Sequence, residues 1–513
     1  MGQFAASRKE NTKDMGGTMK TKAKPWLLEN LRFAYYFLGV VYLALGLVML
    51  GLEVLSLVLR ESPWGFLTGA VVGLGLGGWF RRLGDPKHEP GRAEALLSIA
   101  LIWLLVPALG AIPFWISGGM SYLDALFEAM SGFTTTGATA LADFSQFGYS
   151  LFFWRSLMQW FGGVGILVLL TALLAHLAVA GRQLFITEST GVQKEPFTPR
   201  LRTAAQSILK VYTALTLAAA VCYWLAGIPW FEAVCNALTT LPAAGFSPNP
   251  RSFEQYSPLA QWFGTLFMFL AGAGFVLQYR LFFSRDPRPL LQDVELRVYS
   301  LIVLVFSLAL AAFLMTHHAP NMNYSWGDAL RHAFFNVTSI ISTTGYASAD
   351  FALWVPAAQA ILVAAMFVGG CAGSGAGGIK VIRLLVVGAI VRRELIRSLH
   401  PQAIITLRLG HKTLGEDVMR SVAAFITLYV ALMAAGALLI SLLENNFVVG
   451  LTASAQAIGN IGPGLGEVGP MGSYAGLEPL SKVILIFQMW AGRIELIPVF
   501  LLFTPELWKK LRG

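Results

Sequence analysis

Four glycine-centred segments recur along the chain: Thr134-Thr135-Thr136-Gly137-Ala138, Pro242-Ala243-Ala244-Gly245-Phe246, Ser342-Thr343-Thr344-Gly345-Tyr346 and Gly459-Asn460-Ile461-Gly462-Pro463. Their central glycines are 108, 100 and 117 residues apart. A near-constant spacing of this kind indicates an internal repeat. The first and third copies are the most alike, because Ala-Asp-Phe follows both, at residues 142–144 and 349–351. Each period has room for two helices that span a bilayer and for one shorter helix.

Long apolar stretches lie around these segments. They run near residues 31–58, 63–80, 94–117, 148–180, 204–228, 256–283, 297–316, 352–391, 418–443 and 479–504. Most are long enough to cross a bilayer core of about 30 Å as helices. The semi-apolar segments 122–133 and 231–240 directly precede two of the glycine segments and are too short to span. We expect them to form re-entrant or buried half-helices.

The composition is typical of a membrane protein. Hydrophobic residues make up 56% of the 513 residues and charged residues only 13%, whereas about a quarter of an ordinary globular protein is charged. A plain soluble enzyme is thereby excluded. The net charge of +9 does not indicate a nucleic-acid partner, because the basic residues lie between apolar stretches, as they do in cytoplasmic loops. The three cysteines have neither CxxC nor CxxH spacing, so no disulfide framework or zinc site is predicted.

The placement of Lys and Arg predicts the orientation. Basic residues gather in the connections 81–92, 181–202, 280–297 and 383–412 and at the C-terminal end, which indicates that these parts and both termini are cytoplasmic. We therefore expect a multi-pass protein of the cell (inner) membrane. The expected organisation is a basic cytoplasmic tail (1–25), a leading transmembrane helix pair (26–92) and four repeats of helix, pore loop and helix at 93–200, 201–290, 291–410 and 411–513.

Four non-helical breaks at membrane depth point to an ion path. Such backbone is tolerated there only where protein surrounds it or a water-filled cavity receives it. Carbonyl oxygens from four symmetrically placed loops can replace the hydration shell of a monovalent cation, and the half-helices would point their partially negative C-termini at the ion. Glycine also serves close helix packing, but packing alone does not explain four copies at equal spacing. The expected fold is all-α, with the four repeats in pseudo-fourfold arrangement around one pore, as in potassium channels.

Seven motifs carry a family resemblance: SGFTTTGAT at 131–139, QWFGGVGI at 159–166, AGFS at 244–247, GGCAGSGAGGIKVIR at 369–383, LHPQA at 399–403, GNIGPGLG at 459–466 and GRIE at 492–495. From about residue 31 onward the chain resembles the Trk-type potassium uptake proteins of the TrkH branch, within the Trk/Ktr/HKT superfamily. The resemblance implies a subunit that is usually homodimeric and passes K⁺ and sometimes Na⁺. It also implies a cytosolic nucleotide-binding ring of the TrkA type as gating partner, so that the nucleotide binds the partner and this chain holds no organic cofactor.

By this resemblance the four loops form a selectivity filter. The expected ion-binding residues are Thr135, Thr136, Gly137, Ala243, Ala244, Gly245, Thr343, Thr344, Gly345, Asn460, Ile461 and Gly462. In related plant transporters a serine at the first filter position accompanies a preference for Na⁺, so glycine at all four positions favours K⁺. The second loop departs from the family's usual AIGG-like form, because Pro242 lacks an N–H and has a fixed φ.

Three polar residues stand nine positions before a filter glycine: Glu128, Asn236 and Asn336, whereas the fourth copy has Ala453. They can support the loops by hydrogen bonding or raise the local cation concentration.

A second glycine-rich stretch, 369–378, interrupts the apolar stretch 352–391. Its poor helix propensity predicts that the helix unwinds there. The stretch matches GxGxxG, but a dinucleotide site needs a preceding strand in a βαβ unit, and helix-like apolar sequence flanks it on both sides. By the family resemblance it lies under the filter and obstructs the cytoplasmic exit. The expected gate residues are Gly373, Ser374, Gly375, Gly377, Gly378, Lys380 and Arg493.

Arg493 stands in the middle of the last apolar stretch. A charge at that depth costs at least about 2.5 kcal/mol, which marks a functional candidate. An internal pair with Glu495 is the alternative. The family places this arginine beneath the filter as an electrostatic barrier. Lys380 and Arg383 can be cytoplasmic anchors or parts of the gate.

The expected function is uptake of K⁺ driven by the membrane potential, which supplies about 2.3 kcal/mol per charge per 100 mV. Symport of K⁺ with Na⁺ or H⁺ and a less selective path for Na⁺ or Rb⁺ remain alternatives, as does a membrane enzyme or scaffold without ion flux. Catalysis has no support, because the seven histidines show no metal-ligand spacing and no Ser/His/Asp set can be placed.

Overall fold

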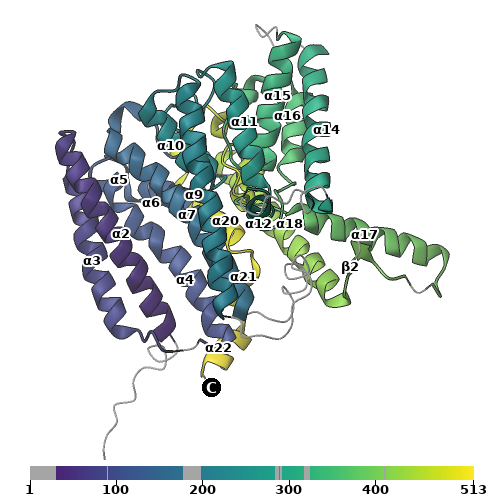
Figure 1. Cartoon of the computed structure of the whole chain (residues 1–513), viewed down its shortest axis with the longest axis horizontal. Helices are drawn as coiled ribbons and strands as arrows, with labels where there is room; N and C mark the ends of the chain where they lie inside the picture. The colour runs from purple at the N-terminus through teal and green to yellow at the C-terminus, as the bar shows by residue number, and fades with distance from the viewer. Residues whose placement is uncertain are drawn as a thin grey trace, which may run out of the picture.

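The computed structural model describes residues 31–88, 90–176, 198–282, 288, 292–316, 324–403, 405–409 and 412–512. The tail 1–25 and most of the basic connection 181–202 lie outside these residues. The described chain is mostly helical, as expected, and its strands are limited to one small antiparallel hairpin. Figure 1 shows helices that run side by side through most of the molecule.

The leading pair consists of α2 (Arg32–Val58) and α3 (Trp64–Leu83). Glycines at their contact allow the two backbones to approach closely, because a Cβ atom on Gly77 would lie 2.8 Å from the backbone nitrogen of Leu43. The pair packs on one flank of the molecule, beside α4 (Figure 1). The leading pair is therefore peripheral and does not surround the four glycine-centred segments.

The same order of elements then occurs four times: a long helix, a half-helix, a glycine-centred segment and a second helix. Repeat 1 contains α4 (Arg92–Gly110), α5 (Ile112–Ile116), α6 (Tyr122–Phe133), η1 (Phe144–Gln146) and α7 (Tyr149–His176). Repeat 2 contains α9 (Thr198–Leu225), α10 (Trp230–Thr240), α11 (Pro258–Gly272) and α12 (Phe275–Phe282). Repeat 3 contains α14 (Val294–Thr316), α15 (Trp326–Ile341), η2 (Phe351–Leu353), α16 (Pro356–Ala365), α17 (Val381–Leu399) and β1 (Arg408–Leu409), and β2 (Lys412–Thr413) follows at the start of repeat 4. Repeat 4 contains α18 (Glu416–Glu444), α19 (Phe447–Gly459), η3 (Gly466–Val468), η4 (Tyr474–Gly476), α20 (Pro479–Arg493), α21 (Ile497–Leu501) and α22 (Pro505–Arg512).

Three of the four half-helices, α6, α15 and α19, begin at polar caps, whereas α10 follows Pro229 without a side-chain cap, and all four end at the glycine segments. Ser121 accepts a hydrogen bond from the N–H of Asp124 at the start of α6, and Ser325 does the same for Asp328 at the start of α15. Such caps satisfy backbone donors that have no partner inside the helix. The half-helices lie in the interior, and the side chains of Glu128, Asn236 and Asn336 are fully buried.

The second helices of repeats 2, 3 and 4 are interrupted. Within the described residues, five helical spans are long and apolar enough to cross a membrane, and α11 with α12 makes a further apolar pair that bends by 109° at its break. The break at 369–378 is where the sequence predicts it. The stretches 256–283 and 479–504 are also broken, at Ala273 and Gly274 and again near Glu495 and Leu496, and these two breaks were not predicted from the sequence. After the first of these breaks, the N–H of Phe275 donates to the carbonyl of Gly373 at 3.1 Å, so the broken end contacts a distant part of the chain.

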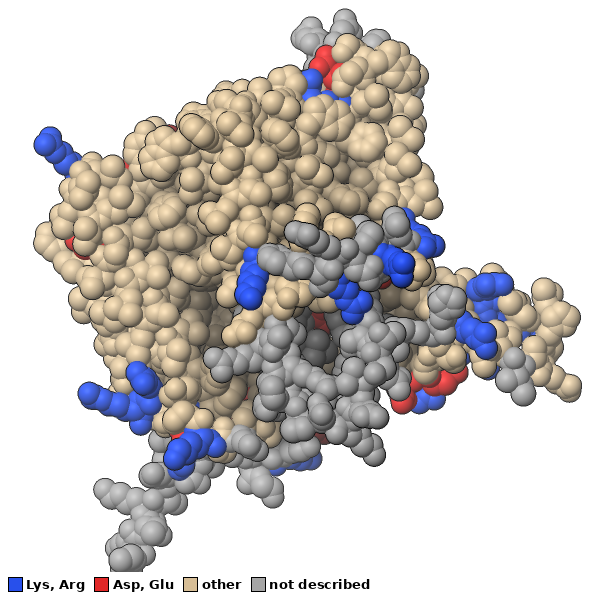
Figure 2. All heavy atoms as spheres, viewed as in Figure 1, with Lys and Arg blue, Asp and Glu red and all other residues tan. Residues whose placement is uncertain are grey.

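The helix α17 extends away from the body as an arm, with the hairpin beside it (Figure 1). Figure 2 shows that most Lys and Arg side chains on this face lie along the arm and the lower part of the molecule, while uncharged residues cover the upper body. On this face, most charged side chains therefore lie toward one end of the helices, with a few at the top and the upper left (Figure 2).

Candidate functional site

The four glycine-centred segments share one backbone conformation. We call them loops 1 to 4: residues 134–138, 242–246, 342–346 and 459–463. The central glycines have positive φ angles, of +84° in Gly137, +80° in Gly245, +81° in Gly345 and +112° in Gly462. The residues two places earlier are also left-handed, with φ of +52° in Thr135, +58° in Ala243, +55° in Thr343 and +52° in Asn460. Because residues with a side chain seldom adopt positive φ, four matching cases indicate one repeated structural requirement.

Each loop terminates its half-helix in the same way. The N–H just before the central glycine donates to a carbonyl five residues back, over 2.8 to 3.1 Å: Thr136 to Ser131, Ala244 to Thr239, Thr344 to Ser339 and Ile461 to Gln456. The loops therefore follow the C-terminal ends of α6, α10, α15 and α19. A helix places roughly half a negative charge at that end, so each loop receives a partial negative charge.

The loops contact one another in a closed order. A Cβ atom added to any of the central glycines would lie closer to the carbonyl oxygen of the next loop than Cβ atoms in proteins lie to any neighbouring atom. The pairs of glycine and carbonyl are Gly137 and Ala244, Gly245 and Thr344, Gly345 and Ile461, and Gly462 and Thr136. Positive φ and the lack of space both exclude a Cβ atom at these positions. The order runs from loop 1 to loop 4 and returns to loop 1.

The four central glycines line one cavity of about 180 Å³. They share it with Arg155, with the residues that follow loops 1 and 2, and with the segment 469–474. Four residues spread over more than 300 positions of sequence thus meet at one place.

The side chains of the loops make unequal contacts. The side-chain amide of Asn460 donates to the hydroxyl of Thr136 at 2.9 Å, which ties loop 4 to loop 1. The hydroxyl of Thr343 accepts a 2.6 Å hydrogen bond from the N–H of Gly377. The buried Oγ1 of Thr135 and Oδ1 of Asn460 have no hydrogen-bond partner among the described residues. Loops 1 and 4 therefore each contain one buried side-chain oxygen that can accept a further hydrogen bond or a cation.

The half-helices support the backbone after three of the loops. The N–H three residues beyond the central glycine donates to Glu128 after loop 1 (2.8 Å), to Asn336 after loop 3 (3.4 Å) and to Thr452 after loop 4 (2.9 Å). The hydrogen bonding expected of Glu128 and Asn336 is confirmed. Position 248 of repeat 2 is a proline without an N–H, and the buried Oδ1 of Asn236 has no partner among the described residues.

The glycine-rich loop (369–378) packs directly against three of the loops. A Cβ atom on Gly375 would lie 3.0 Å from the carbonyl oxygen of Pro242 in loop 2, and one on Gly377 would lie 3.0 Å from the Cβ atom of Asn460 in loop 4. Together with the hydrogen bond from Gly377 to Thr343, these contacts place the glycine-rich loop against loops 2, 3 and 4. Glycine is required here because there is no room for side chains between two layers of backbone.

Hydrogen bonds hold the glycine-rich loop in place from outside. The N–H groups of Cys371 and Gly375 donate to the carbonyls of Gly272 and Ala271 at the broken end of α11, over 2.8 and 3.1 Å. The buried carboxylate of Glu295 on α14 accepts from the N–H of Ala372 at 2.8 Å and from that of Ile382 at 3.0 Å. One carboxylate thus holds both the middle of the loop and the start of α17.

The remaining expected gate residues stabilise the loop internally. The hydroxyl of Ser374 donates to the carbonyl of Cys371 at 2.6 Å, and the ammonium group of Lys380 donates to the carbonyl of Ala376. Gly373 and Gly378 have φ angles of +72° and +65°. The loop connects two helices, α16 and α17, so the strand that a dinucleotide site needs is not part of it.

Arg493 reaches the glycine-rich loop. Its side chain is 4% exposed, and its Nη1 donates to the carbonyl of Gly375 at 3.1 Å, while its Nε and Nη2 have no partner among the described residues. Glu495 pairs instead with Arg383, at 2.6 Å. The alternative prediction, an internal pair between Arg493 and Glu495, is therefore wrong.

Comparison with known proteins assigns the family. The model of the TrkH family, described as a cation transport protein, matches residues 76–510. The chain belongs to the TrkH family. It is 33% identical over 483 residues to the Trk system potassium uptake protein TrkI of Halomonas elongata, covering 92% of this chain and 96% of that protein. It is 33% identical over 428 residues to the Trk system potassium uptake protein TrkH of Salmonella typhimurium, covering 83% and 88%.

A solved structure supports the same assignment. The crystal structure of the potassium transporter TrkH from Vibrio parahaemolyticus superposes with a TM-score of 0.84 at 30% sequence identity, and covers 93% of this chain and 99% of that one. The expected resemblance to the TrkH family and the helical fold are both confirmed. The relatives are transporters rather than enzymes, as the sequence predicts.

Sequence reasoning missed several residues that contact the loops in this TrkH family member. Thr452, one residue before Ala453 on α19, supplies in repeat 4 the support that the alanine cannot give. Glu295 stands at the start of an apolar stretch. Acidic residues are common at that position, so nothing in the sequence marks Glu295 as a contact of the loops. Arg155 could have been recognised from the sequence, because it is a charged residue inside the apolar stretch 148–180. Arg493 was identified by the same criterion.

We expect the Glu295→Gln variant to leak more Rb⁺ than the wild type in a liposome flux assay. Hydrogen bonds to a charged group contribute about 1.5–3 kcal/mol each, and the neutral amide accepts from Ala372 and Ile382 more weakly. The glycine-rich loop should therefore open more often, with a rise in basal flux of severalfold. The exposed Glu506→Gln substitution on α22 is the matched control, and a flux equal to this control would contradict the anchoring role of Glu295.

Proposed function

We propose that this chain is the ion-conducting subunit of a potassium uptake system, with loops 1 to 4 as its selectivity filter. The names of the relatives given above supply the transported ion, K⁺. The observation that carries the filter proposal is that Gly137, Gly245, Gly345 and Gly462 line one cavity. Carbonyl oxygens on four sides can replace the water that K⁺ loses. K⁺ is therefore the cargo of the protein rather than a resident cofactor.

The filter proposal includes the residues just before each glycine. Thr135, Thr136, Ala243, Ala244, Thr343, Thr344, Asn460 and Ile461 would contribute backbone carbonyls together with the four glycines. The unpartnered Oγ1 of Thr135 and Oδ1 of Asn460 are further oxygen ligands of the kind that an alkali cation accepts. The C-terminal ends of the four half-helices favour a cation at the same place.

We propose that the glycine-rich loop and Arg493 form the gate. The loop packs against loops 2, 3 and 4, so a cation that leaves the filter meets it next. The guanidinium of Arg493 adds a positive charge beside Gly375, which repels a passing cation. Opening then requires that Gly373, Ser374, Gly375, Gly377 and Gly378 move away together, and Lys380 ties this segment to α17 through the carbonyl of Ala376.

The placement in the membrane follows from charge. The Lys and Arg side chains along the lower part and the α17 arm in Figure 2 would face the cytoplasm, with both termini on that side of the inner membrane. The domain organisation that we propose is the one expected above, with a leading pair and four repeats. An inside-negative potential supplies about 2.3 kcal/mol per charge per 100 mV, which is sufficient to drive uptake without a pump site.

The partners that we propose are a second copy of the chain and a TrkA-type nucleotide-binding ring. The α17 arm exposes three apolar side chains at four-residue spacing, Val391, Leu395 and Leu399, with 52%, 64% and 78% of each accessible. Such a helical face is suited to a protein contact. Movement of this arm would act on the glycine-rich loop through Lys380 at its start.

Uptake of ⁸⁶Rb⁺ into K⁺-loaded liposomes that contain the purified protein tests the proposal. We expect external K⁺ to suppress uptake and external Na⁺ to have little effect. Equal suppression by both ions would contradict the selective filter and favour a less selective path. Dependence of the reversal potential on a Na⁺ or H⁺ gradient would favour symport. No flux from either the wild type or Arg493→Ala protein would contradict transport by this chain alone.

A further inference from the structure

Arg155 is a buried charge beside the cavity that the four central glycines line. It stands on α7, its side chain is 3% exposed, and it is part of the cavity wall. Its Nε lies 2.5 Å from Oε1 of Glu128 on α6, which is fully buried. A buried charge without a counter-charge is strongly unfavourable. Because Glu128 balances the charge of Arg155, the pair adds no net charge to the wall of the cavity.

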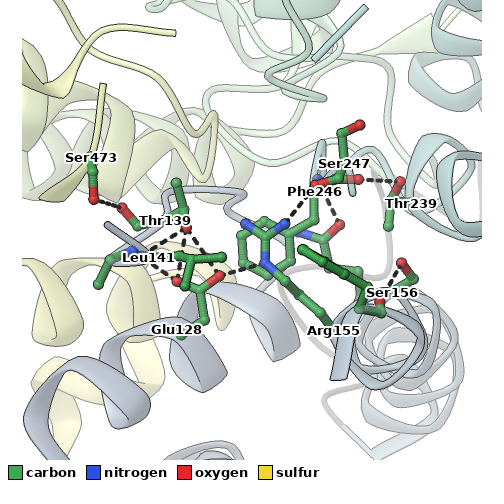
Figure 3. A network of polar contacts seen from close by, with 12 residues as sticks. Glu128, Thr139, Leu141, Arg155, Ser156, Thr239, Phe246, Ser247 and Ser473 are labelled. Carbon is green, nitrogen blue, oxygen red and sulfur yellow. Dashed lines mark hydrogen bonds and ion pairs between the residues drawn. The ribbon is translucent and has the colours of Figure 1, made fainter. Parts of the chain in front are cut away.

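The two partners of this pair contact different loops. Glu128 accepts from the N–H of Ala140 at 2.8 Å and from the hydroxyl of Thr139 at 3.2 Å, just after loop 1. Arg155 donates from Nη1 to the carbonyl of Ser247 at 2.9 Å, and its guanidinium carbon lies 3.5 Å from the centre of the Phe246 ring, at the end of loop 2. Figure 3 shows Arg155 between Glu128 on one side and Phe246 and Ser247 on the other. The pair thus connects loop 1 to loop 2.

Loop 2 is the loop that lacks support three residues beyond its glycine. The proline at 248 cannot donate to Asn236, and the corresponding supports of loops 1, 3 and 4 come from their own half-helices. Repeat 1 supplies the missing contact, because Arg155 bonds the carbonyl of Ser247. Gln159, one helical turn further along α7, accepts from the N–H of Phe246 at 3.0 Å and donates to the carbonyl of Ala244 at 2.8 Å.

We propose that Glu128 and Arg155 are positioning residues for ion selectivity, which hold loops 1 and 2 at a fixed separation. The proposal rests on the proposed function of the loops as a filter. A filter discriminates ions of different size only if its oxygens keep their spacing or their number around the ion. The planar fork of arginine suits this task, since it pairs with a carboxylate, donates to a carbonyl and stacks on a ring at the same time.

Two variants that keep the buried charge balanced test the proposal. Arg155→Lys retains a cation for Glu128 but lacks the planar fork, and the double variant Glu128→Gln, Arg155→Met removes both charges. We expect both to fold, and we expect the preference for Rb⁺ over Na⁺ in the liposome competition assay to fall about tenfold, which corresponds to about 1.4 kcal/mol. Size-exclusion profiles and melting temperatures report folding. If the double variant does not fold, Arg155→Lys decides.

The matched control is Lys482→Met. Lys482 forms another ion pair between repeats, at 2.5 Å from the half-buried Asp124, and donates to the carbonyl of Ala475. Neither of these partners belongs to loop 1 or loop 2. We expect wild-type selectivity from this control. Wild-type selectivity in folded Arg155→Lys or double-variant protein would overturn the proposal. If Gly345→Ser still alters selectivity in that case, the filter stands and only the role of the pair fails; if Gly345→Ser is also silent, the filter itself is wrong.

Discussion

The Gly345→Ser variant is expected to lose at least about tenfold of the preference for K⁺ over Na⁺, which corresponds to about 1.4 kcal/mol. The backbone of Gly345 has a φ of +81°, and a residue with a side chain pays about 1–2 kcal/mol to adopt the left-handed region. The new Cβ atom would also collide with the carbonyl oxygen of Ile461 in loop 4. Both effects displace oxygens that we propose to contact the ion. Competition of K⁺ and Na⁺ against ⁸⁶Rb⁺ uptake measures the change.

A glycine in open space provides the control for this substitution. Gly75 on α3 is exposed, and a Cβ atom added to it would meet no atom of another element within 4 Å, so Gly75→Ser adds the same group far from the loops. We expect wild-type selectivity from it. Unchanged selectivity in Gly345→Ser protein that elutes as a single folded species would remove the filter assignment.

The Arg493→Ala variant is expected to conduct at least about tenfold more ⁸⁶Rb⁺ than the wild type. A unit charge 4 to 10 Å from a passing cation raises its energy by about 2–4 kcal/mol at an effective dielectric constant near 20. The substitution also removes the hydrogen bond to the carbonyl of Gly375 and thereby loosens the glycine-rich loop. Initial rates of uptake into K⁺-loaded liposomes measure the effect.

Two further variants separate charge from hydrogen bonding in the gate. Arg493→Lys keeps the positive charge without the planar fork, so an increase that occurs in Arg493→Ala but not in Arg493→Lys assigns the barrier to charge. Arg420→Ala on α18 removes an exposed arginine and should leave the flux unchanged. A lower flux in correctly folded Arg493→Ala protein would be incompatible with a barrier role.

Features that depend on neighbours in sequence were predictable. The half-helix expected at 122–133 is α6 (Tyr122–Phe133), because a serine cap precedes it and a glycine segment follows it. The break within 352–391 was predictable from its glycines, which lower helix propensity over a continuous run. The four loops were predictable from their spacing, since positive φ at a central glycine is a local requirement that repeats with the duplicated unit.

Features that depend on which faces meet were not predictable. Nothing near Glu295 in the sequence points to the glycine-rich loop 77 residues away, and nothing near Ala273 and Gly274 points to the hydrogen bond between Phe275 and Gly373 of that loop. Hydropathy gives the length of an apolar helix but not the neighbour that each side of it contacts. For the same reason the sequence could not decide whether Arg493 contacts Glu495 or the glycine-rich loop.

By itself the sequence determined the class of protein, the four loops, the interrupted helix and a short set of charged residues inside apolar stretches. These follow from composition, periodic spacing and the conformational freedom of glycine, all of which act over a few neighbouring residues. Only the tertiary structure decided that the four glycines share one cavity, that Arg493 bonds Gly375 while Glu495 pairs with Arg383, and that Arg155 joins loop 1 to loop 2. Such contacts join residues far apart in the chain, and the packing of the helices selects them from many arrangements that bury the same apolar surface.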